Sequence, residues 1–283
     1  MLFRSWTDYK QFKSSDDWEA IIKTAIEKGG MLVSGRAGTG KSYIVEQGIK
    51  NGLLPADPRT RLAFTNRAAR NIGGSTIHRA IGINGNNHFT KMMISTINAS
   101  KIKIEDVEYN IFVIDEISMI YADLWNKLLI LRKKCSNPVF ILLGDYRQCP
   151  PIEDGKEIDY FNHPYTKIMT NSNCCELMKP KRYDLQLWKW LEDYYEEGIE
   201  GEEISKKKVG IENILYRKNI CYSNRVRMRI NELCMNEMIK SKTKYIVLEA
   251  PEKDEKNTKS QKTYLYAGLP IMAVVANQEL ELV

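Results

Sequence analysis

Cysteine pairs with metal-binding spacing and long hydrophobic runs are both missing from this sequence. The six cysteines form no Cys-x-x-Cys pair, and only Cys174 and Cys175 are adjacent. This spacing argues against a zinc site and against a disulfide framework, and it favours a reducing, intracellular compartment. No apolar run approaches the ~20 residues that span a bilayer, and the first residues lack the apolar core of a signal peptide. We therefore expect no membrane partner and a cytoplasmic or nuclear location, a viral replication compartment included.

A strong excess of one charge is also absent. The formal net charge of +6 is below the strongly basic footprint of a small nucleic-acid-binding module, so it permits a polyanionic partner without requiring one. Basic runs at residues 179–182 and 206–208 have two readings, localisation signals or solvated turns, and the second is favoured because short basic runs are weak motifs. The 283 residues, 43% of them hydrophobic, have room for about two globular domains.

Residues 35–42 read Gly-Arg-Ala-Gly-Thr-Gly-Lys-Ser, a complete phosphate-binding loop (P-loop) of the form G-x-x-x-x-G-K-[ST]. An apolar run precedes the loop and a helical pattern follows it, as the motif requires. Successive backbone N–H groups and the helix N-terminus then surround a phosphate. The lysine would reach the terminal phosphates of ATP and the serine hydroxyl would ligate Mg²⁺. The predicted nucleotide-binding residues are Gly35, Ala37, Gly38, Thr39, Gly40, Lys41 and Ser42.

A pair of carboxylates follows the apolar run at residues 111–114. Such a run is typical of a strand buried in a parallel sheet, and ligands bind beyond the carboxyl ends of these strands. We therefore predict that Asp115 holds Mg²⁺ and that Glu116 is the general base that deprotonates the attacking water. The alternative, a solvated acidic pair at a strand end, is disfavoured by the phosphate-binding loop earlier in the chain. This arrangement predicts hydrolysis as well as binding.

Strand and helix patterns alternate along the first half of the chain, which predicts crossover units and an α/β fold with a parallel sheet. Residues 82–103, rich in glycine and asparagine, break this pattern and look like an insertion. A second unit is predicted from Glu176 onward. The predicted strands are residues 31–34, 61–65, 111–115, 139–143, 219–222, 245–248 and 271–275, and the predicted helices are residues 43–52, 67–72, 122–133, 184–197 and 225–239.

The fourth of these strands runs into Leu143-Gly144-Asp145-Tyr146-Arg147-Gln148-Cys149-Pro150-Pro151-Ile152. Its Gly-Asp end places another polar group at the same edge of the sheet. Gln148 can accept a hydrogen bond from the attacking water and donate one to the γ-phosphate, so we predict that it senses that phosphate. The two prolines fix an extended backbone directly afterwards.

In this order, the motifs resemble those of the superfamily 1B DNA helicases, and most of all the petite integration frequency (PIF) helicases and their RecD and Dda relatives. Leu177, with Arg182 and Asp184, is similar to the segment that opens their second motor domain. The resemblance implies a RecA-like P-loop NTPase domain at residues 1–175 and a second, incomplete RecA-like motor domain at residues 176–283. The matching segments are residues 35–42, 65–69 (Thr-Asn-Arg-Ala-Ala), 74–78 (Gly-Ser-Thr-Ile-His), 113–119 and 143–152.

The resemblance also implies an activity, which is ATP-dependent movement 5′ to 3′ along single-stranded DNA with unwinding of forked duplexes in replication, recombination or repair. Residues of two matching segments would then follow the DNA backbone. Taken alone, the histidine among them would be read as an ordinary surface or core histidine. The implied DNA-binding residues are Thr65, Asn66, Arg67, Thr76 and His78.

Two further roles are implied by the resemblance. Arg182 would reach the γ-phosphate from the second domain and stabilise charge in the transition state, with a solvated basic turn as its alternative. The insertion, taken as residues 82–105, stands where the family carries its strand-separating pin, and His88 or Phe89 would stack on a base there. The implied catalytic residues are Lys41, Glu116, Gln148 and Arg182.

The sequence departs from the family at both ends. Trp18 stands where the family carries a glutamine that reads the adenine edge, so selectivity for adenine is left open. The family's Thr-x-His-Lys-x-Gln-Gly segment and its terminal Ser-Arg motif have no counterpart, and residues 258–262 are only superficially similar. We therefore expect an incomplete motor: a fragment, a split product, or a chain whose missing half comes from a second chain. A nucleotide-gated DNA-binding module is the alternative function, and a phosphotransferase is disfavoured.

Overall fold

The computed structural model describes residues 9–12, 17–82, 88–145, 147–148, 151, 161–186, 188–189, 224–240, 244–249 and 262–267. The chain divides into two compact units, Met1–Gly198 and Ile199–Val283. Most of the helix predicted at residues 184–197, and the strands predicted at residues 219–222 and 271–275, lie outside the described residues. Within the described part of the chain, no helix is long and apolar enough to cross a membrane.

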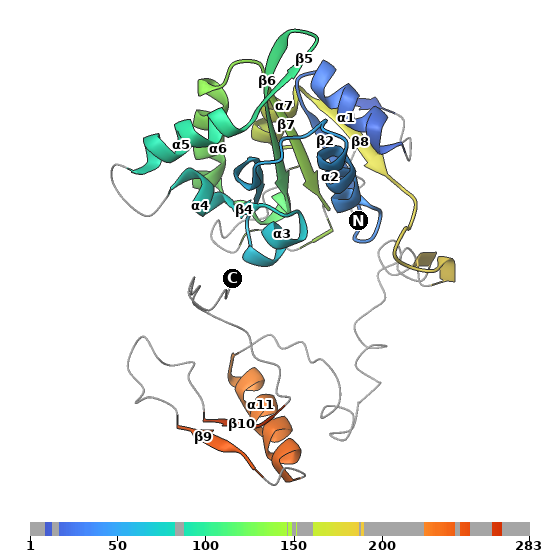
Figure 1. Cartoon of the computed structure of the whole chain (residues 1–283). Coiled ribbons are helices and arrows are strands. Elements are labelled where there is room, and N and C mark those ends of the chain that lie inside the picture. Colours follow the sequence, from blue (N-terminus) through green and yellow to red (C-terminus); the bar gives the residue numbers. More distant parts are fainter. Residues whose placement is uncertain are drawn as a thin grey trace. The chain divides into compact units, whose positions relative to one another are not determined.

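An eight-stranded sheet forms the centre of the first unit (Figure 1). Its strands follow the order β1-β8-β2-β7-β6-β3-β4, all parallel along this path, and β5 adds an antiparallel edge to β6. The predicted parallel α/β fold is therefore confirmed. The strands are β1 (Lys10–Phe12), β2 (Met31–Gly35), β3 (Arg61–Ala63), β4 (Ser75–Thr76), β5 (Lys101–Ile104), β6 (Val107–Asp115), β7 (Pro138–Gly144) and β8 (Asn173–Leu177).

Helices cover both faces of this sheet because its central strands are apolar on both faces. Along β6, Ile111 and Val113 point into one hydrophobic cluster while Phe112 and Ile114 point into the other, which is the two-residue period of a strand. The first cluster packs against α1 (Trp18–Glu27), α2 (Lys41–Lys50) and α3 (Asn66–Asn71). The second packs against α4 (Ile77–Ile81), α6 (Ala122–Lys134) and α7 (Pro164–Thr170).

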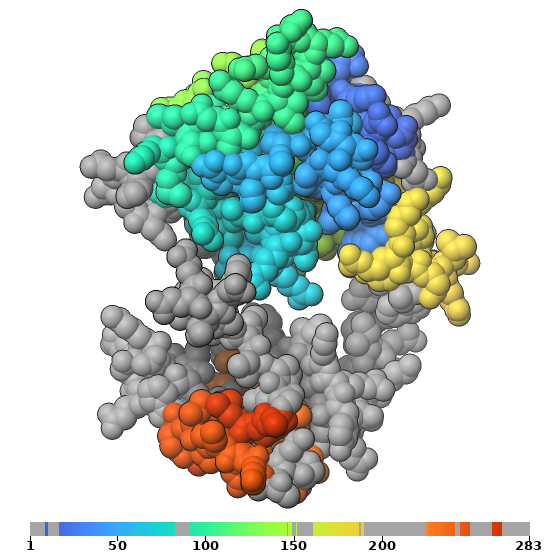
Figure 2. Space-filling view, in the orientation of Figure 1, coloured from blue at the N-terminus to red at the C-terminus, as the bar shows by residue number. Residues whose placement is uncertain are grey.

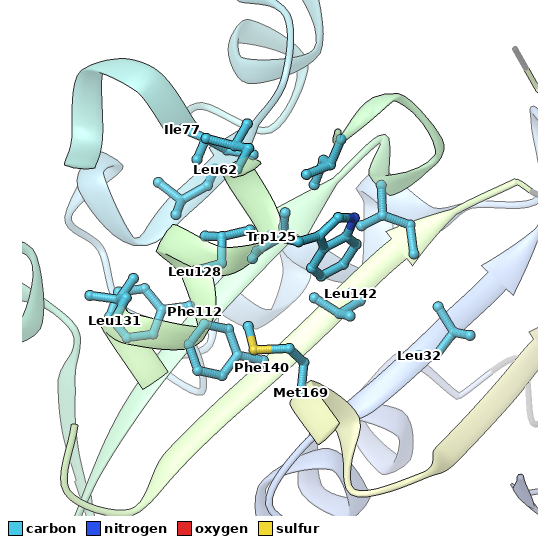
Figure 3. Close-up of a cluster of buried hydrophobic side chains, with 14 of the residues drawn as sticks. Leu32, Leu62, Ile77, Phe112, Trp125, Leu128, Leu131, Phe140, Leu142 and Met169 are labelled. Carbon is cyan, nitrogen blue, oxygen red and sulfur yellow. The ribbon is translucent and has the colours of Figure 1, made fainter. Parts of the chain in front are cut away.

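The three largest fully buried side chains, Trp125, Phe112 and Phe140, lie on the α6 face of the sheet, as Figure 3 shows. Trp125 of α6 is fully buried there. Beneath that helix, the rings of Phe112 and Phe140 stack with their centroids 5.1 Å apart. Full burial of each such side chain contributes about 1.5–3 kcal/mol, so this face holds a large share of the stability of the unit.

The segment predicted as an insertion contains more regular structure than its turn-forming residues suggest. Residues 88–99 form α5 (His88–Ala99), and β5 follows directly. The helix contains several β-branched residues, which have low helix propensity, so its packing decides its structure. Met93 is buried, and the Thr96 hydroxyl donates to the Ala80 carbonyl at 2.9 Å. The His88 and Phe89 side chains lie outside the described residues, so the pin stays a prediction.

In the second unit the described elements are one helix and one hairpin. The helix is α11 (Asn224–Lys240), close to the helix predicted at residues 225–239. The hairpin pairs β9 (Ile246–Leu248) with β10 (Thr263–Leu265) in antiparallel register, and β9 falls within the strand predicted at residues 245–248.

Arg61 anchors the chain between α3 and β4. Its side chain is buried, and its guanidinium donates hydrogen bonds to backbone carbonyls on both sides of β3. Burial lowers the pKa of Arg61, but a guanidinium stays charged in proteins, so its hydrogen bonds remain charge-assisted. The accepting carbonyls belong to Pro55, Ala56, Asp57, Ile72 and Gly73.

A side chain at Gly74 is expected to destabilise this anchor. A Cβ atom added at Gly74 would lie 2.1 Å from the Arg61 carbonyl oxygen, a backbone atom that cannot swing away. Gly74→Ala should therefore lower the free energy of unfolding of the first unit by about 1–3 kcal/mol. Urea denaturation followed by tryptophan fluorescence measures this directly, because all five tryptophans lie within Met1–Gly198. An unchanged unfolding midpoint would contradict the steric argument.

Candidate active site at the sheet edge

The carboxyl ends of the parallel strands bring the predicted site residues to one edge of the sheet. Strand β2 ends at the phosphate-binding loop, β6 ends at Asp115 and β7 ends at Gly144. Further along the same edge, β3 and β4 lead into α3 and α4 (Figure 1). Ligands of open α/β sheets bind at this edge, so the topology alone selects it as the candidate site.

The phosphate-binding loop has the backbone that its glycines allow. Gly38 and Gly40 have φ angles of +84° and +102°, which side-chain-bearing residues rarely adopt. The Lys41 ammonium folds back over the loop and donates to the Gly35 and Arg36 carbonyls at 2.6 and 3.0 Å. Burial lowers the pKa of Lys41, and nearby carboxylates partly oppose this effect. The two hydrogen bonds therefore fix the Lys41 Nζ atom at the base of the site.

Two adjacent carboxylates lie beyond the end of β6. Asp115 is 5% exposed. Burial, and then the neighbouring charge of Glu116, raise the pKa of Asp115 to about 6. Burial also raises the pKa of Glu116. Glu116 has a φ of +55°, an uncommon conformation for a glutamate and one that clusters at functional sites. Paired carboxylates that are costly to ionise in this setting are suited to binding a cation or accepting a proton.

A single cavity of about 390 Å³ collects most of the predicted nucleotide residues. Gln148 reaches it from the segment after β7, and Arg182 reaches it from the segment after β8 within the first unit. The backbone N–H groups of Lys181 and Arg182 both donate to the Gly38 carbonyl, at 2.8 and 3.1 Å. The cavity is lined by Ala37, Gly38, Gly40, Lys41, Ser42, Tyr43, Asn71, Asp115, Glu116, Gln148, Lys181 and Arg182.

The donor set in this cavity fits Mg²⁺ bound with a nucleotide. Within the described residues, no group of three or more His, Cys, Asp or Glu side chains could hold a metal ion. Magnesium at phosphate sites is usually held by one or two carboxylates together with substrate phosphates and waters. The Ser42 hydroxyl and the Asp115 carboxylate line the same cavity as the phosphate-binding loop, so they supply that partial set.

Asp145 holds the phosphate-binding loop against the end of β7, a role that its sequence motif does not reveal. One carboxylate oxygen accepts from the Ala37 N–H at 3.0 Å, and the other accepts from the Arg147 N–H at 3.0 Å. Asp145 is only 5% exposed. Its position after the Gly144 strand end was the available signal, but a motif does not show which backbone amide a carboxylate accepts from.

Removing Asp145 should weaken nucleotide binding. Asp145→Ala leaves a part-buried loop amide without its acceptor, a loss worth about 1–3 kcal/mol, so the KM for ATP should rise roughly tenfold or more. Asp123→Ala is the matched control, because Asp123 is an exposed residue of α6 outside the cavity. Steady-state hydrolysis measures both variants. A KM equal to that of the unaltered protein would show that the loop holds its shape without Asp145.

An apolar pocket of about 450 Å³ adjoins the phosphate-binding loop. Trp18 of α1 and Tyr43 of α2 supply aromatic rings to it. The Thr39 hydroxyl at its base donates to the Arg36 carbonyl at 2.8 Å, so it is already engaged within the loop. The pocket shares three lining residues with the polar cavity, so the two lie next to each other. It is lined by Trp18, Ile21, Thr39, Gly40, Tyr43, Ile44, Leu177 and Lys181.

The residues that the resemblance assigns to DNA lie at the ends of β3 and β4. Both threonines cap helices: Thr65 accepts from the Ala68 N–H, and Thr76 accepts from the Arg79 N–H. Asn66 and Arg67 are exposed on the first turn of α3. None of these side chains lines the nucleotide cavity, so the structure separates the two sets of residues along one edge.

His78 is held by neighbouring aromatic residues. Its Nε2 atom lies 3.2 Å from the Tyr121 hydroxyl, and its ring centroid lies 5.6 Å from that of Phe64. The half-buried His78 ring thus has well-defined partners. Its DNA-binding role stays a prediction.

Known proteins are similar to this chain in sequence and in fold. A family model described as an AAA domain matches residues 17–154. The ATP-dependent DNA helicase PIF1 of Mus musculus is 30% identical over 156 residues, which is 53% of this chain and 24% of that protein. The Saccharomyces cerevisiae PIF1 is 35% identical over 148 residues, or 49% of this chain and 17% of that protein. The aligned region thus spans about a quarter or less of these relatives.

Solved structures show the same fold. The crystal structure of Pif1 helicase from Candida albicans matches with a TM-score of 0.62 at 19% identity, covering 93% of this chain and 65% of that one. The structure of Bacteroides Pif1 bound to ssDNA matches with a TM-score of 0.63 at 18% identity, with the same coverage of both chains. At this level of identity, the likeness concerns the fold alone.

Proposed function

This chain is a homologue of the PIF1-family helicases, and from that premise we propose that it is part of an ATP-driven motor that moves 5′ to 3′ along single-stranded DNA and opens duplexes at forks. The observation that carries the proposal is the single cavity that contains Lys41, Ser42, Asp115, Glu116, Gln148 and Arg182. Replication, recombination and repair are the proposed settings for this activity, and single-stranded and forked DNA are the proposed partners.

Each group in the cavity has a distinct part in the proposed reaction. Lys41 and the loop amides bind the terminal phosphates. Ser42 and Asp115 would hold Mg²⁺, which would supply positive charge beside those phosphates. Glu116 takes a proton from the attacking water, and Gln148 orients that water. Arg182 stabilises the charge that develops on the γ-phosphate in the transition state. Closure of the site on ATP then alternates with release after hydrolysis, and each cycle shifts the protein along the strand.

Hydrolysis of ATP by the purified chain, with and without single-stranded DNA, tests this proposal. We expect DNA to stimulate hydrolysis, and we expect Lys41→Ala and Glu116→Gln to abolish the stimulated rate. Unwinding of a duplex with a 5′ single-stranded tail then tests the motor directly. Binding of ATP and DNA without any hydrolysis would overturn the motor and support the alternative, a nucleotide-gated DNA-binding module.

The apolar pocket predicts weak discrimination among nucleobases. We propose that it holds the base by stacking on Trp18 and Tyr43, and none of its lining residues carries a carboxamide or carboxylate to read a base edge. Apolar pockets discriminate by only about 10–200-fold, so the kcat/KM values for GTP, CTP and UTP should lie within roughly a hundredfold of that for ATP. Trp18→Ala should raise the KM for all four about tenfold through lost stacking. A preference for ATP above ten-thousandfold would contradict this interpretation.

A further inference from the structure

Helix α3 ends in the nucleotide cavity. Its last residue is Asn71, which lines the cavity together with Lys41, Ser42 and Glu116. Asn71 belongs to none of the nucleotide-binding motifs, and its side chain is exposed to the cavity and solvent. A carboxamide both donates and accepts hydrogen bonds, so it can contact a phosphate oxygen as well as an ordered water beside it.

The opposite end of α3 carries the proposed DNA contacts. Thr65 caps the helix, and Asn66 and Arg67 are exposed on its first turn. A helix of six residues is only about 9 Å long. Single-stranded DNA bound at one end of α3 would therefore lie about one helix length from a nucleotide at the other end. Figure 2 shows the residues of α3 (cyan) beside those of α2 (blue), the helix that begins in the phosphate-binding loop.

Packing holds the middle of α3 and hydrogen bonds hold its carboxyl end, so the helix keeps its shape when its exposed first turn is bound. Ala68 and Ala69 are buried against the strands. After the helix, the Gly74 N–H donates to the Ala69 carbonyl at 2.8 Å, and Arg61 binds the Ile72 and Gly73 carbonyls. A short helix with a capped start and an anchored end transmits a displacement because it has little freedom to bend or unwind.

We propose that α3 couples DNA binding to the nucleotide cavity and that Asn71 is the residue through which it acts. This inference rests on the proposed function, and it adds a route between the two ligands. Single-stranded DNA bound at Thr65–Arg67 sets the position of α3. That position in turn sets the contact of the Asn71 carboxamide with the terminal phosphate and with the attacking water. By thermodynamic linkage, the nucleotide changes the affinity for DNA by the same factor by which DNA changes the affinity for the nucleotide.

The coupling factor between the two ligands measures this role separately from either binding step. Affinity for a fluorescent single-stranded oligonucleotide is measured with and without a non-hydrolysable ATP analogue, and affinity for the analogue is measured with and without the oligonucleotide. We expect a coupling factor of about 5-fold or more for the unaltered chain. Asn71→Ala should bring the factor to about one, whereas Asn71→Gln, which keeps the carboxamide, should retain most of it.

Asn51→Ala is the matched control, because Asn51 is an exposed residue at the end of α2 that does not line the cavity. It should leave the coupling factor unchanged. A coupling factor in Asn71→Ala equal to that of the unaltered chain would overturn the role of Asn71 while leaving the proposed function intact, even if both affinities fell together. A factor of one in the unaltered chain, or no binding of single-stranded DNA, would instead overturn the proposed function itself.

Discussion

Substituting Lys41 with alanine is expected to lower kcat/KM for ATP by roughly a thousandfold or more. One positive charge facing the γ-phosphate has an effect of this size in phosphoryl transfer. The Lys41 ammonium is part-buried and held by the Gly35 and Arg36 carbonyls at the base of the loop. Alanine removes the charge and leaves both carbonyls without this donor. Burial strengthens the effect, because solvent screens a buried charge less than an exposed one.

Lys50→Ala is the matched control for this loss. Lys50 is an exposed residue in the last turn of the same helix, α2, so its removal deletes an identical charge outside the cavity. Hydrolysis by Lys50→Ala should stay close to that of the unaltered chain, and this control should unfold at the same denaturant concentration as the parent. If Lys41→Ala retained more than about a tenth of the hydrolytic rate, Lys41 would not face the terminal phosphates in the way that phosphoryl transfer requires.

The nucleotide site could be predicted from the sequence because its parts are local. A strand, a glycine-rich turn and a helix N-terminus are consecutive in residues 31–50, and each has a short-range signal. Asp115 and Glu116 follow a buried strand in the same way. The rule that parallel strands end at one edge then brings these separate segments together without knowledge of the strand order. The cavity confirms that Lys41, Ser42, Asp115 and Glu116 lie together.

The remaining features depend on tertiary contacts that leave no local pattern. Helix α5 forms from a segment of low helix propensity because Met93 and Thr96 pack against α4. Strand β4 has only two residues, too few for a two-residue period to be recognised. Asn71 lines the cavity because of the length and orientation of α3. The Asp145 carboxylate accepts a hydrogen bond from the Ala37 N–H only once the loop has folded against it. Sequence patterns predict elements well and contacts between them poorly.

Substituting Glu116 with glutamine is expected to lower kcat by about a hundredfold to ten-thousandfold, the contribution typical of a general base. Glutamine keeps the size of the side chain and a hydrogen-bond acceptor, but it cannot take the proton of the attacking water. Nucleotide binding should persist or tighten, since removing one of two adjacent carboxylates relieves their repulsion beside the phosphates. Binding of a fluorescent ATP analogue, measured beside single-turnover hydrolysis, separates the two effects.

Glu108→Gln provides the control for this substitution on the same strand, β6, where Glu108 is exposed and distant from the strand's carboxyl end. It should hydrolyse ATP at the rate of the unaltered chain. The unusual backbone of Glu116, with its φ of +55°, should be as accessible to glutamine as to glutamate, so a change in folding does not account for the expected loss. A Glu116→Gln variant with an unaltered single-turnover rate would show that another group accepts the proton, and Asp115 would then be the next residue to substitute.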